Sequence, residues 1–235
     1  MRIFLAGAGG AIGRRLTPLL VRAGHAVIGT TRSADKAETI AALGATPAVV
    51  DVFDADALAR AVKDAAADVV LHQLTDLAFA PGSPRYQEAL ARNARLRVEG
   101  TRNLVAAAEA AGVRRMLAQS IAFIYAPGPG LRVESDALDD DAARAATVEA
   151  VRVLEDATLA LPEGIVLRYG YLYGPDTWYE TPVKPPSVHV DAAAQACALA
   201  LAKAAPGVYN IAEDDGYCSS GKARHAFGFD AGFRL

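Results

Sequence analysis

The sequence predicts an α/β protein that is built on a doubly wound parallel sheet and ends in a small C-terminal subdomain. Two observations support this prediction. Short apolar runs of strand length alternate with longer segments in which apolar residues recur at helical spacing. This alternation is typical of βαβ units, in which helices cover both faces of a parallel sheet. In addition, a glycine-rich turn joins the first predicted strand to the first predicted helix.

The alternation yields the predicted elements in chain order. Strands are predicted at 2–6, 26–31, 46–50, 68–72, 116–119, 165–169 and 207–211. Helices are predicted at 14–24, 34–43, 54–66, 85–111, 141–161, 192–204 and 219–227. We assign residues 1–170 to the main domain and residues 171–235 to the smaller subdomain, which we expect to be interleaved with the first.

The turn GAGGAIG places Gly7, Gly10 and Gly13 between the first strand and the first helix. In a dinucleotide-binding unit, one such glycine allows the tight turn, one lets the backbone approach a pyrophosphate, and one lets the helix pack closely against the strand. The helix N-terminus offers free N–H groups and the positive end of its dipole to the phosphates. We therefore predict a dinucleotide site of the Rossmann type; a plain turn without a ligand is the alternative.

The end of the second strand indicates which dinucleotide is preferred. An acidic residue there would accept hydrogen bonds from the adenosine ribose of NAD. This chain has Thr31 and Arg32 instead, with Lys36 a turn further on, and a cation suits the 2′-phosphate of NADP. A charge-assisted hydrogen bond is worth roughly 1.5–3 kcal/mol, or about one to two orders of magnitude in affinity. We expect NADP(H) to be preferred and NAD to be possible; a solvated Arg32 that stacks on adenine would serve either.

The Gly-x-x-Gly-x-x-Gly spacing resembles that of the short-chain dehydrogenase/reductase superfamily, in particular its extended branch of nucleotide-sugar epimerases and dehydratases. Two later stretches strengthen the resemblance. GTRNLVAAAEAAGVRRMLAQS, residues 100–120, is similar to the branch's Gly-Thr-x-Asn-Leu segment and the strand after it. VLRYGYLYGPDT, residues 166–177, resembles its Leu-Arg-x-x-x-x-Tyr-Gly-Pro signature, and SVHVD, residues 187–191, its next strand with Asp191 as a helix cap. The resemblance covers nearly the whole chain.

The resemblance and the expected reversal of strand order after the fourth strand together predict the cofactor contacts. Asp51 is expected to hydrogen-bond the adenine amino group, although it could also cap a helix, and residues 73–75 are expected to line the ribose and nicotinamide. His72, nearby, is interpreted as structural. The residues predicted to contact the cofactor are Gly7, Gly10, Ala11, Ile12, Gly13, Thr31, Arg32, Asp51, Val52, Gln73, Leu74, Thr75, Tyr169 and Leu172.

The catalytic pair of the superfamily is missing from this chain. The resemblance implies Tyr-x-x-x-Lys on the helix at 141–161, but the corresponding residues are Thr147 and Val151, and no tyrosine in the chain has a lysine four residues later. In such a pair the lysine charge lowers the pKa of the tyrosine toward neutrality, and this helix has neither residue. Arg97 also stands where the branch usually has asparagine. We therefore identify an atypical member of the superfamily.

Two residues remain as catalytic candidates. The resemblance makes Ser120 the group that would contact the reacting oxygen of a substrate. Tyr169 is a candidate for the missing phenol, and the alternative is that at least two of the tyrosines at 169, 171 and 173 serve in packing. Tyr171 and Tyr173 are further candidates, since alternate positions face one way if the backbone stays extended. The proton could equally come from Thr75, bound water or the substrate.

These features predict an NADP(H)-dependent oxidoreductase that transfers hydride to or from a small carbonyl or alcohol without the Tyr-Lys pair. One alternative is a nucleotide-sugar epimerase or dehydratase. The other is a non-catalytic sensor that binds NADP(H), which an intact glycine turn without the catalytic pair would also suit.

Composition limits the classes of partner. The net charge of −3 argues against nucleic acid, two cysteines are too few for a disulfide framework, and no apolar run is long enough to span a membrane. We read no signal peptide and expect a cytoplasmic protein with a small-molecule substrate and no metal site. The resemblance implies a possible homodimer that pairs the helices at 85–111 and 141–161.

Overall fold

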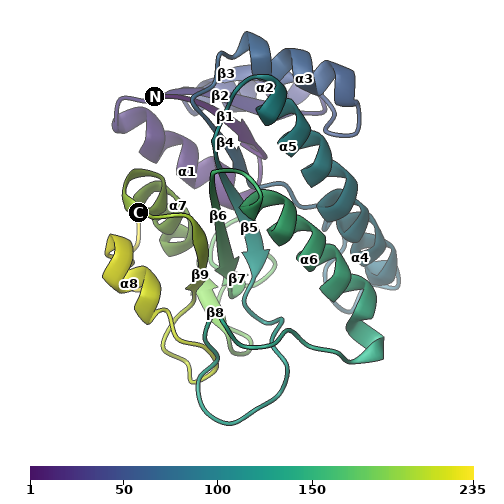
Figure 1. Ribbon diagram of the computed structural model, residues 1–235, viewed down its shortest axis with the longest axis vertical. Coiled ribbons are helices and arrows are strands. Elements are labelled where there is room, and N and C mark those ends of the chain that lie inside the picture. The colour runs from purple at the N-terminus through teal and green to yellow at the C-terminus, as the bar shows by residue number, and fades with distance from the viewer.

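A seven-stranded sheet forms the centre of the protein in a computed structural model that describes residues 1–235 (Figure 1). The strand order is β3-β2-β1-β4-β5-β6-β9, and every neighbouring pair is parallel. The strands are β1 (Arg2–Ala6), β2 (Ala26–Thr31), β3 (Thr46–Val49), β4 (Val69–His72), β5 (Arg115–Ile121), β6 (Glu163–Tyr169) and β9 (Gly207–Ile211). The predicted doubly wound α/β fold is confirmed.

Helices cover both faces of the sheet (Figure 1). One face carries α1 (Ala11–Arg22), α2 (Ala37–Ala42), α7 (Val190–Lys203) and α8 (Gly221–Phe227), and the other carries α3 (Ala55–Asp64), α4 (Tyr86–Arg95), α5 (Thr101–Ala110) and α6 (Ala145–Leu159). Strand β1 serves both layers because successive side chains point to opposite faces. Ile3 and Leu5 enter the buried cluster with α1 and α7, whereas Phe4 and Ala6 enter the cluster with α3 and α5.

Several predicted helices consist of consecutive segments of different pitch. The helix predicted at 85–111 is continuous from α4 to α5 but contains a π-helical turn, η2 (Leu96–Gly100). The helices predicted at 34–43 and 141–161 begin with 3-10 turns, η1 (Ala34–Lys36) and η3 (Ala142–Arg144). Sequence periodicity does not resolve these turns, because each lasts about one turn and its side-chain spacing departs little from the α-helical one.

The sheet reverses its strand order between β1 and β4. Strand β1 pairs with β2 on one side and with β4 on the other, so the chain builds outward in opposite directions from this point. Ligands of open α/β sheets bind in the crevice at the carboxyl ends of the two strands that flank such a reversal. The fold therefore directs attention to the segments that follow Ala6 and His72.

The chain leaves the main sheet at Gly170, and this separates three tyrosines. Tyr169 ends β6, whereas Tyr171 and Tyr173 belong to β7 (Tyr171–Tyr173), which pairs in parallel with β8 (Ser187–His189) in a separate two-stranded sheet. A Cβ on Gly170 would lie 2.8 Å from the Pro186 carbonyl oxygen, so glycine permits the close approach of the two segments. The tyrosines consequently do not share one face, which differs from the expectation for an extended backbone.

The prediction that Asp191 caps α7 is wrong, because that position is taken by His189. The backbone N–H of Asp191 donates to Nδ1 of His189 at 3.2 Å, and α7 begins at Val190. The Asp191 carboxylate instead accepts from Nε of Arg15 on α1 at 2.7 Å and from the backbone N–H of Leu235 at 3.1 Å. Asp191 thus ties α7 to α1 and to the C-terminal end.

Residues after 170 contribute to both parts of the molecule. Strand β9 completes the main sheet and α7 packs in its core, whereas β7 and β8 form a separate sheet from which Val188 also packs into that core. The division at residue 170 into a main domain and a substrate-binding subdomain stays a prediction. Cys197 and Cys218 are both buried and unbridged. None of the helices combines the length and the apolar character needed to cross a membrane.

Candidate cofactor and substrate site

The glycine turn brings bare backbone to the reversal point of the sheet. Gly7 has φ +98°, and a Cβ there would lie 2.6 Å from the carbonyl oxygen of Gln73, which follows β4. A Cβ on Gly13 would fall on the Gly7 carbonyl oxygen and 2.7 Å from that of Ala8, so the first turn of α1 packs directly on the loop. Gly10 is the N-cap of α1 and supplies no side chain to the free N–H groups, and the first turn has no acidic residue.

A cavity of about 230 Å³ lies at the carboxyl ends of β1, β2 and β4. Of the predicted cofactor residues, it is lined by Gly7, Gly10, Thr31, Arg32, Val52, Gln73, Leu74 and Thr75. Backbone approach at a glycine cradle, an uncapped helix N-terminus and a half-apolar wall all suit a dinucleotide. The residues present therefore fit an NAD(P)H molecule.

The other predicted cofactor residues lie outside the lining of this cavity. Ala11, Ile12 and Gly13 form the first turn of α1 behind Gly10. The Asp51 carboxylate accepts from the backbone N–H of Phe53 at 3.0 Å, and α3 is capped by Asp54 instead. Leu172 packs against the core cluster beside α7. Contact between these residues and a cofactor stays a prediction.

A group of charged residues lies where the cavity meets the end of β2. Arg32 lines it with 60% of its side chain exposed, and its guanidinium lies 3.8 Å from the Asp76 carboxylate. Arg92 of α4 approaches the same carboxylate at 3.5 Å, and Lys36 also lines the cavity. Arg92 also pairs with Glu88 at 3.4 Å, so the cations on the cavity wall itself are Arg32 and Lys36.

Sequence reasoning missed part of the cavity wall. Phe53 follows the predicted pair Asp51 and Val52 and lies under the guanidinium of Arg95, 4.1 Å from its ring centroid. The available signal was an aromatic residue directly after that predicted pair. Leu96 begins the π-helical turn and also lines the cavity, but no local pattern predicts that position.

Ser120 lies in a buried polar network rather than on the cavity wall. Its hydroxyl donates to Oε1 of Glu155 on α6 at 2.6 Å, and it is fully buried. Arg168 of β6 donates to both oxygens of the same carboxylate, at 2.9 and 2.6 Å, and to the Tyr125 hydroxyl at 2.8 Å. Tyr125 in turn donates to Asn210 at 2.6 Å. The network joins β5, β6, β9 and α6, and it accounts for the arginine of the signature at 166–177.

The three tyrosines that follow one another at alternate positions have different surroundings. Tyr169 is 1% exposed on the α7 side of the sheet, and burial beside Cys197 raises its pKa well above 10. Tyr173 donates to Glu213 at 2.5 Å, and burial and that carboxylate raise its pKa to about 12. Tyr171 stacks on Phe123, with ring centroids 3.8 Å apart. Proton donation near neutral pH is unfavourable for the first two.

The position of the missing catalytic pair is apolar. Val151 is fully buried and packs with Val148, Ile121 and Ile124 in a small cluster between α6 and the segment after β5. Thr147 is partly buried on the preceding turn of α6. The positions where a tyrosine and a lysine would have stood are thus taken by a partly buried threonine and a fully buried valine.

A family model described as NAD(P)H-binding matches residues 7–178, which include the glycine turn, the cavity wall and the network around Arg168. The chain belongs to the NAD(P)H-binding family. Membership agrees with the predicted cofactor class, although it does not distinguish NADP from NAD.

Two curated relatives of this NAD(P)H-binding protein are reductases by name. It is 46% identical to a 3-diazoavenalumate denitrifying reductase of a Streptomyces species, over 76% of this chain and 59% of the relative. It is 34% identical to a 4-hydroxy-2-methyl-3-oxo-4-farnesyl-3,4-dihydroquinoline-1-oxide ketoreductase of Stigmatella aurantiaca, over 57% of this chain and 38% of the relative. The chain thus spans less than two thirds of the length of either relative.

Solved structures confirm the resemblance to the extended branch at the level of the fold. A UDP-glucose 4-epimerase from Stenotrophomonas maltophila with bound NAD superposes with a TM-score of 0.80 at 17% identity, covering 100% of this chain and 94% of that one. The UDP-glucose 4-epimerase of Thermus thermophilus, in complex with NAD, has a TM-score of 0.73 at 22% identity, covering 92% and 79% of the two chains.

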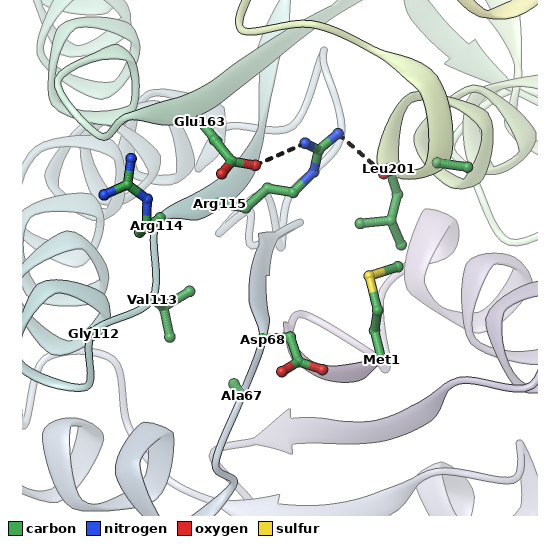
Figure 2. A pocket seen from close by; sticks show the side chains of 10 residues that line it. Met1, Ala67, Asp68, Gly112, Val113, Arg114, Arg115, Glu163 and Leu201 are labelled. Atoms are coloured by element: carbon green, nitrogen blue, oxygen red, sulfur yellow. Dashed lines mark hydrogen bonds and ion pairs between the residues drawn. The ribbon is translucent and has the colours of Figure 1, made fainter.

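A second, larger cavity of this NAD(P)H-binding protein, about 540 Å³, lies at the opposite edge of the sheet (Figure 2). Met1, Asp68 and Arg115 line it at the amino ends of their strands. Arg115 donates to Glu163 at 3.0 Å and to the carbonyl oxygen of Leu201 at 3.1 Å, and thereby caps the C-terminus of α7. Arg115, Glu163 and Asp68 have structural partners, and none of the glycines of the turn lines this cavity.

Protonation of His72 makes the free energy of unfolding depend on pH in the acidic range. Nδ1 accepts from the Leu74 N–H at 3.3 Å, so Nε2 donates to Thr101 at 3.0 Å and the ring is neutral. Burial first, and Arg97 second, lower the pKa of His72 from 6.5 to about 4. Because the unfolded chain binds this proton more readily, stability is lost as pH falls from about 6.5 to 4, by about 3 kcal/mol in total.

We expect this loss to be absent from His72→Gln. Urea unfolding of the wild type and the variant at several pH values between 4 and 7 measures the difference in slope. His225→Gln, which changes an exposed histidine on α8, is the control and keeps the wild-type slope. Equal slopes in His72→Gln and wild type would contradict the assignment.

Proposed function

We propose that the protein is an NAD(P)H-dependent reductase that delivers hydride without a protein acid at the reacting centre. The replacement of the superfamily's Tyr-x-x-x-Lys pair by Thr147 and the buried Val151 is the observation that carries the proposal. The cavity beside the glycine turn would hold the cofactor, with Gly7 and Gly10 against the pyrophosphate and residues 73–75 toward the nicotinamide. When bound, NAD(P)H supplies hydride from its nicotinamide ring.

Such a site suits an acceptor that needs hydride but no proton. A diazonium-type carbon is one: a C–H bond forms from the hydride, the C–N bond breaks, and its electron pair leaves with dinitrogen while the cofactor is oxidised. The charges balance with no proton to donate. The relative at 46% identity is named a denitrifying reductase of a diazo compound, which supports this class of acceptor for this chain. The protein's own contribution would be to hold the two reactants at reacting distance and exclude water.

Deuteride transfer tests this proposal. The protein is incubated with NADPH carrying deuterium at nicotinamide C4 and an aromatic diazonium carboxylate, and dinitrogen and product are analysed by mass spectrometry. We expect dinitrogen and oxidised cofactor in equal amounts, deuterium on the carbon that carried nitrogen, and a rate well above that of the protein-free reaction. Cofactor oxidation without dinitrogen release would contradict the diazo acceptor. If no acceptor leads to oxidation of the cofactor, the alternative of a non-catalytic sensor that binds NADP(H) remains.

Carbonyl reduction is the second candidate, and the ketoreductase relative at 34% identity favours it. Here the developing alkoxide needs a proton, and the exposed Thr75 hydroxyl is a donor on the cavity wall. The catalytic roles predicted for Ser120 and Tyr169 belong to this candidate and would require both to leave their buried surroundings. Deuterium on a carbinol carbon identifies this reaction.

Arg32 is proposed to select NADP(H) over NAD(H). We expect Arg32→Ala to weaken NADPH binding by about tenfold or more, because one charge-assisted contact to the 2′-phosphate is lost, and to leave NADH binding unchanged. Calorimetric titration of both cofactors into both proteins measures this. NADH is the internal control, since it lacks the phosphate; an equal loss for both cofactors would assign Arg32 to adenine stacking.

A homodimer through α4, α5 and α6 stays a proposal, as does a cytoplasmic location. The outward face of α6 carries the charged side chains of Glu149, Arg152 and Asp156, so the pairing would be polar at its edges. Sedimentation at several concentrations tests it.

A further inference from the structure

Arg97 is an arginine without a side-chain partner, and it directly follows Leu96, which lines the proposed cofactor cavity. It stands on the π-helical turn η2 and is only partly exposed, yet it makes no side-chain hydrogen bond and no ion pair. Its nitrogens are not among the buried atoms that lack a partner, so solvent reaches the guanidinium. Arg92 and Arg95 on the preceding helix are both paired with carboxylates.

The helix that carries Arg97 faces the carboxyl end of β4. One turn before it, Asn93 accepts from the backbone N–H of Asp76 at 2.9 Å; one turn after it, Thr101 is bonded to Nε2 of His72 at 3.0 Å. Residues four apart on a helix lie on the same side, so Arg97 points to the same strand end. A π turn at this point is notable because such turns occur frequently at functional sites.

The charges around Arg97 do not balance. The nearest carboxylate with an effect on it, Glu155, already accepts two bonds from Arg168 and one from Ser120. His72, on the other side, is neutral. The group of Arg97, Arg168, Glu155 and His72 thus has a net charge of +1. A partly buried cation without a counter-ion is costly, and a bound anion removes that cost.

We propose that Arg97 binds a carboxylate of the substrate and so restricts the enzyme to acidic substrates. A single guanidinium matches a monoanion, and its planar fork fits both oxygens of a carboxylate. A phosphate dianion would call for more than this one cation. The assignment rests on the proposed reductase function, because it places the carboxylate beside the nicotinamide end of the cavity.

Binding of an unreactive probe tests the assignment without turnover. Cinnamate and its neutral amide, cinnamamide, are titrated by calorimetry into the NADPH complexes of wild type, Arg97→Met and Arg97→Lys. We expect Arg97→Met to weaken cinnamate binding by about tenfold or more, Arg97→Lys by less, and neither to change binding of the amide or of NADPH. Arg102→Met, which removes an exposed and unpaired arginine one turn later, is the control and binds cinnamate as the wild type does.

Two results would overturn the assignment. One is equal cinnamate binding by wild type and a folded Arg97→Met; the other is no preference of the wild type for the acid over the amide. If Arg97→Met does not fold, Arg97→Gln and Arg97→Lys provide the comparison. With a reactive acidic substrate, Arg97→Met should raise KM and spare kcat, whereas a loss confined to kcat would mean that Arg97 acts on the reacting oxygen instead. If neither the wild type nor any variant transfers hydride but cinnamate still binds as expected, the result counts against the reductase function and not against the anion site.

Discussion

Gly13→Ala is expected to abolish measurable NADPH binding and to lower the free energy of unfolding by about 2–3 kcal/mol. The new Cβ would fall on the Gly7 carbonyl oxygen and lie 2.7 Å from that of Ala8, and these backbone atoms cannot rotate away as a flexible side chain could. Helix α1 must therefore move off the loop, and the N–H groups at its start move with it. Calorimetry with NADPH and urea unfolding measure the two effects.

Gly9→Ala is the control for stability in this experiment. A Cβ on Gly9 meets nothing within 4 Å, although Gly9 lines the same cavity. We expect its free energy of unfolding to equal that of the wild type. Wild-type NADPH affinity in Gly13→Ala would show that the glycine turn is not the cofactor cradle.

Arg168→Met is expected to lower the free energy of unfolding by about 3–5 kcal/mol. Arg168 and Glu155 are 5% and 4% exposed, and their two-point contact is shared with Ser120 and Tyr125. Removing the arginine leaves a buried carboxylate without its counter-ion, and this uncompensated charge is the source of the large effect. Urea unfolding at neutral pH measures it.

An exposed ion pair of the same geometry provides the control. Arg95 donates to both oxygens of Glu99 at 2.7 and 3.1 Å, but these side chains are 60% and 43% exposed. We expect Arg95→Met to be far less destabilising than Arg168→Met, since water solvates the charge that remains. The double change Glu155→Leu with Arg168→Met should be less destabilising than Arg168→Met alone. Similar costs for the buried and the exposed pair would contradict this account.

The sequence was a good guide where a feature depends on neighbouring residues. The glycine turn, the seven strands of the main sheet and the cation at the end of β2 were all predicted, because each is a short pattern of residue types that acts through backbone conformation or local charge. The apolar replacement of Tyr-x-x-x-Lys was visible in the same way. The reversal of strand order was expected too, as part of the Rossmann-type fold.

The sequence was a poor guide to what individual side chains contact. Ser120 stands near a strand end, as an active-site residue would. Its hydroxyl nevertheless donates to the buried carboxylate of Glu155, 35 residues later in the chain. Tyr169 and Tyr171 are two residues apart but separated by the chain's departure from the sheet at Gly170. Asp191 has the sequence position and residue type of a helix cap. Its carboxylate instead accepts a hydrogen bond from Arg15, which is 176 residues away in the chain.

What the sequence by itself determined is the family, the fold and the backbone that can receive a dinucleotide, since these depend on patterns repeated along the chain. Only the tertiary structure decided which polar side chains remain free to meet a ligand. Buried polar groups pair with whatever donor or acceptor the packed layers bring to them, however distant in sequence. Pairing in this way occupies Ser120, Glu155 and Arg168 and leaves Arg97 without a partner.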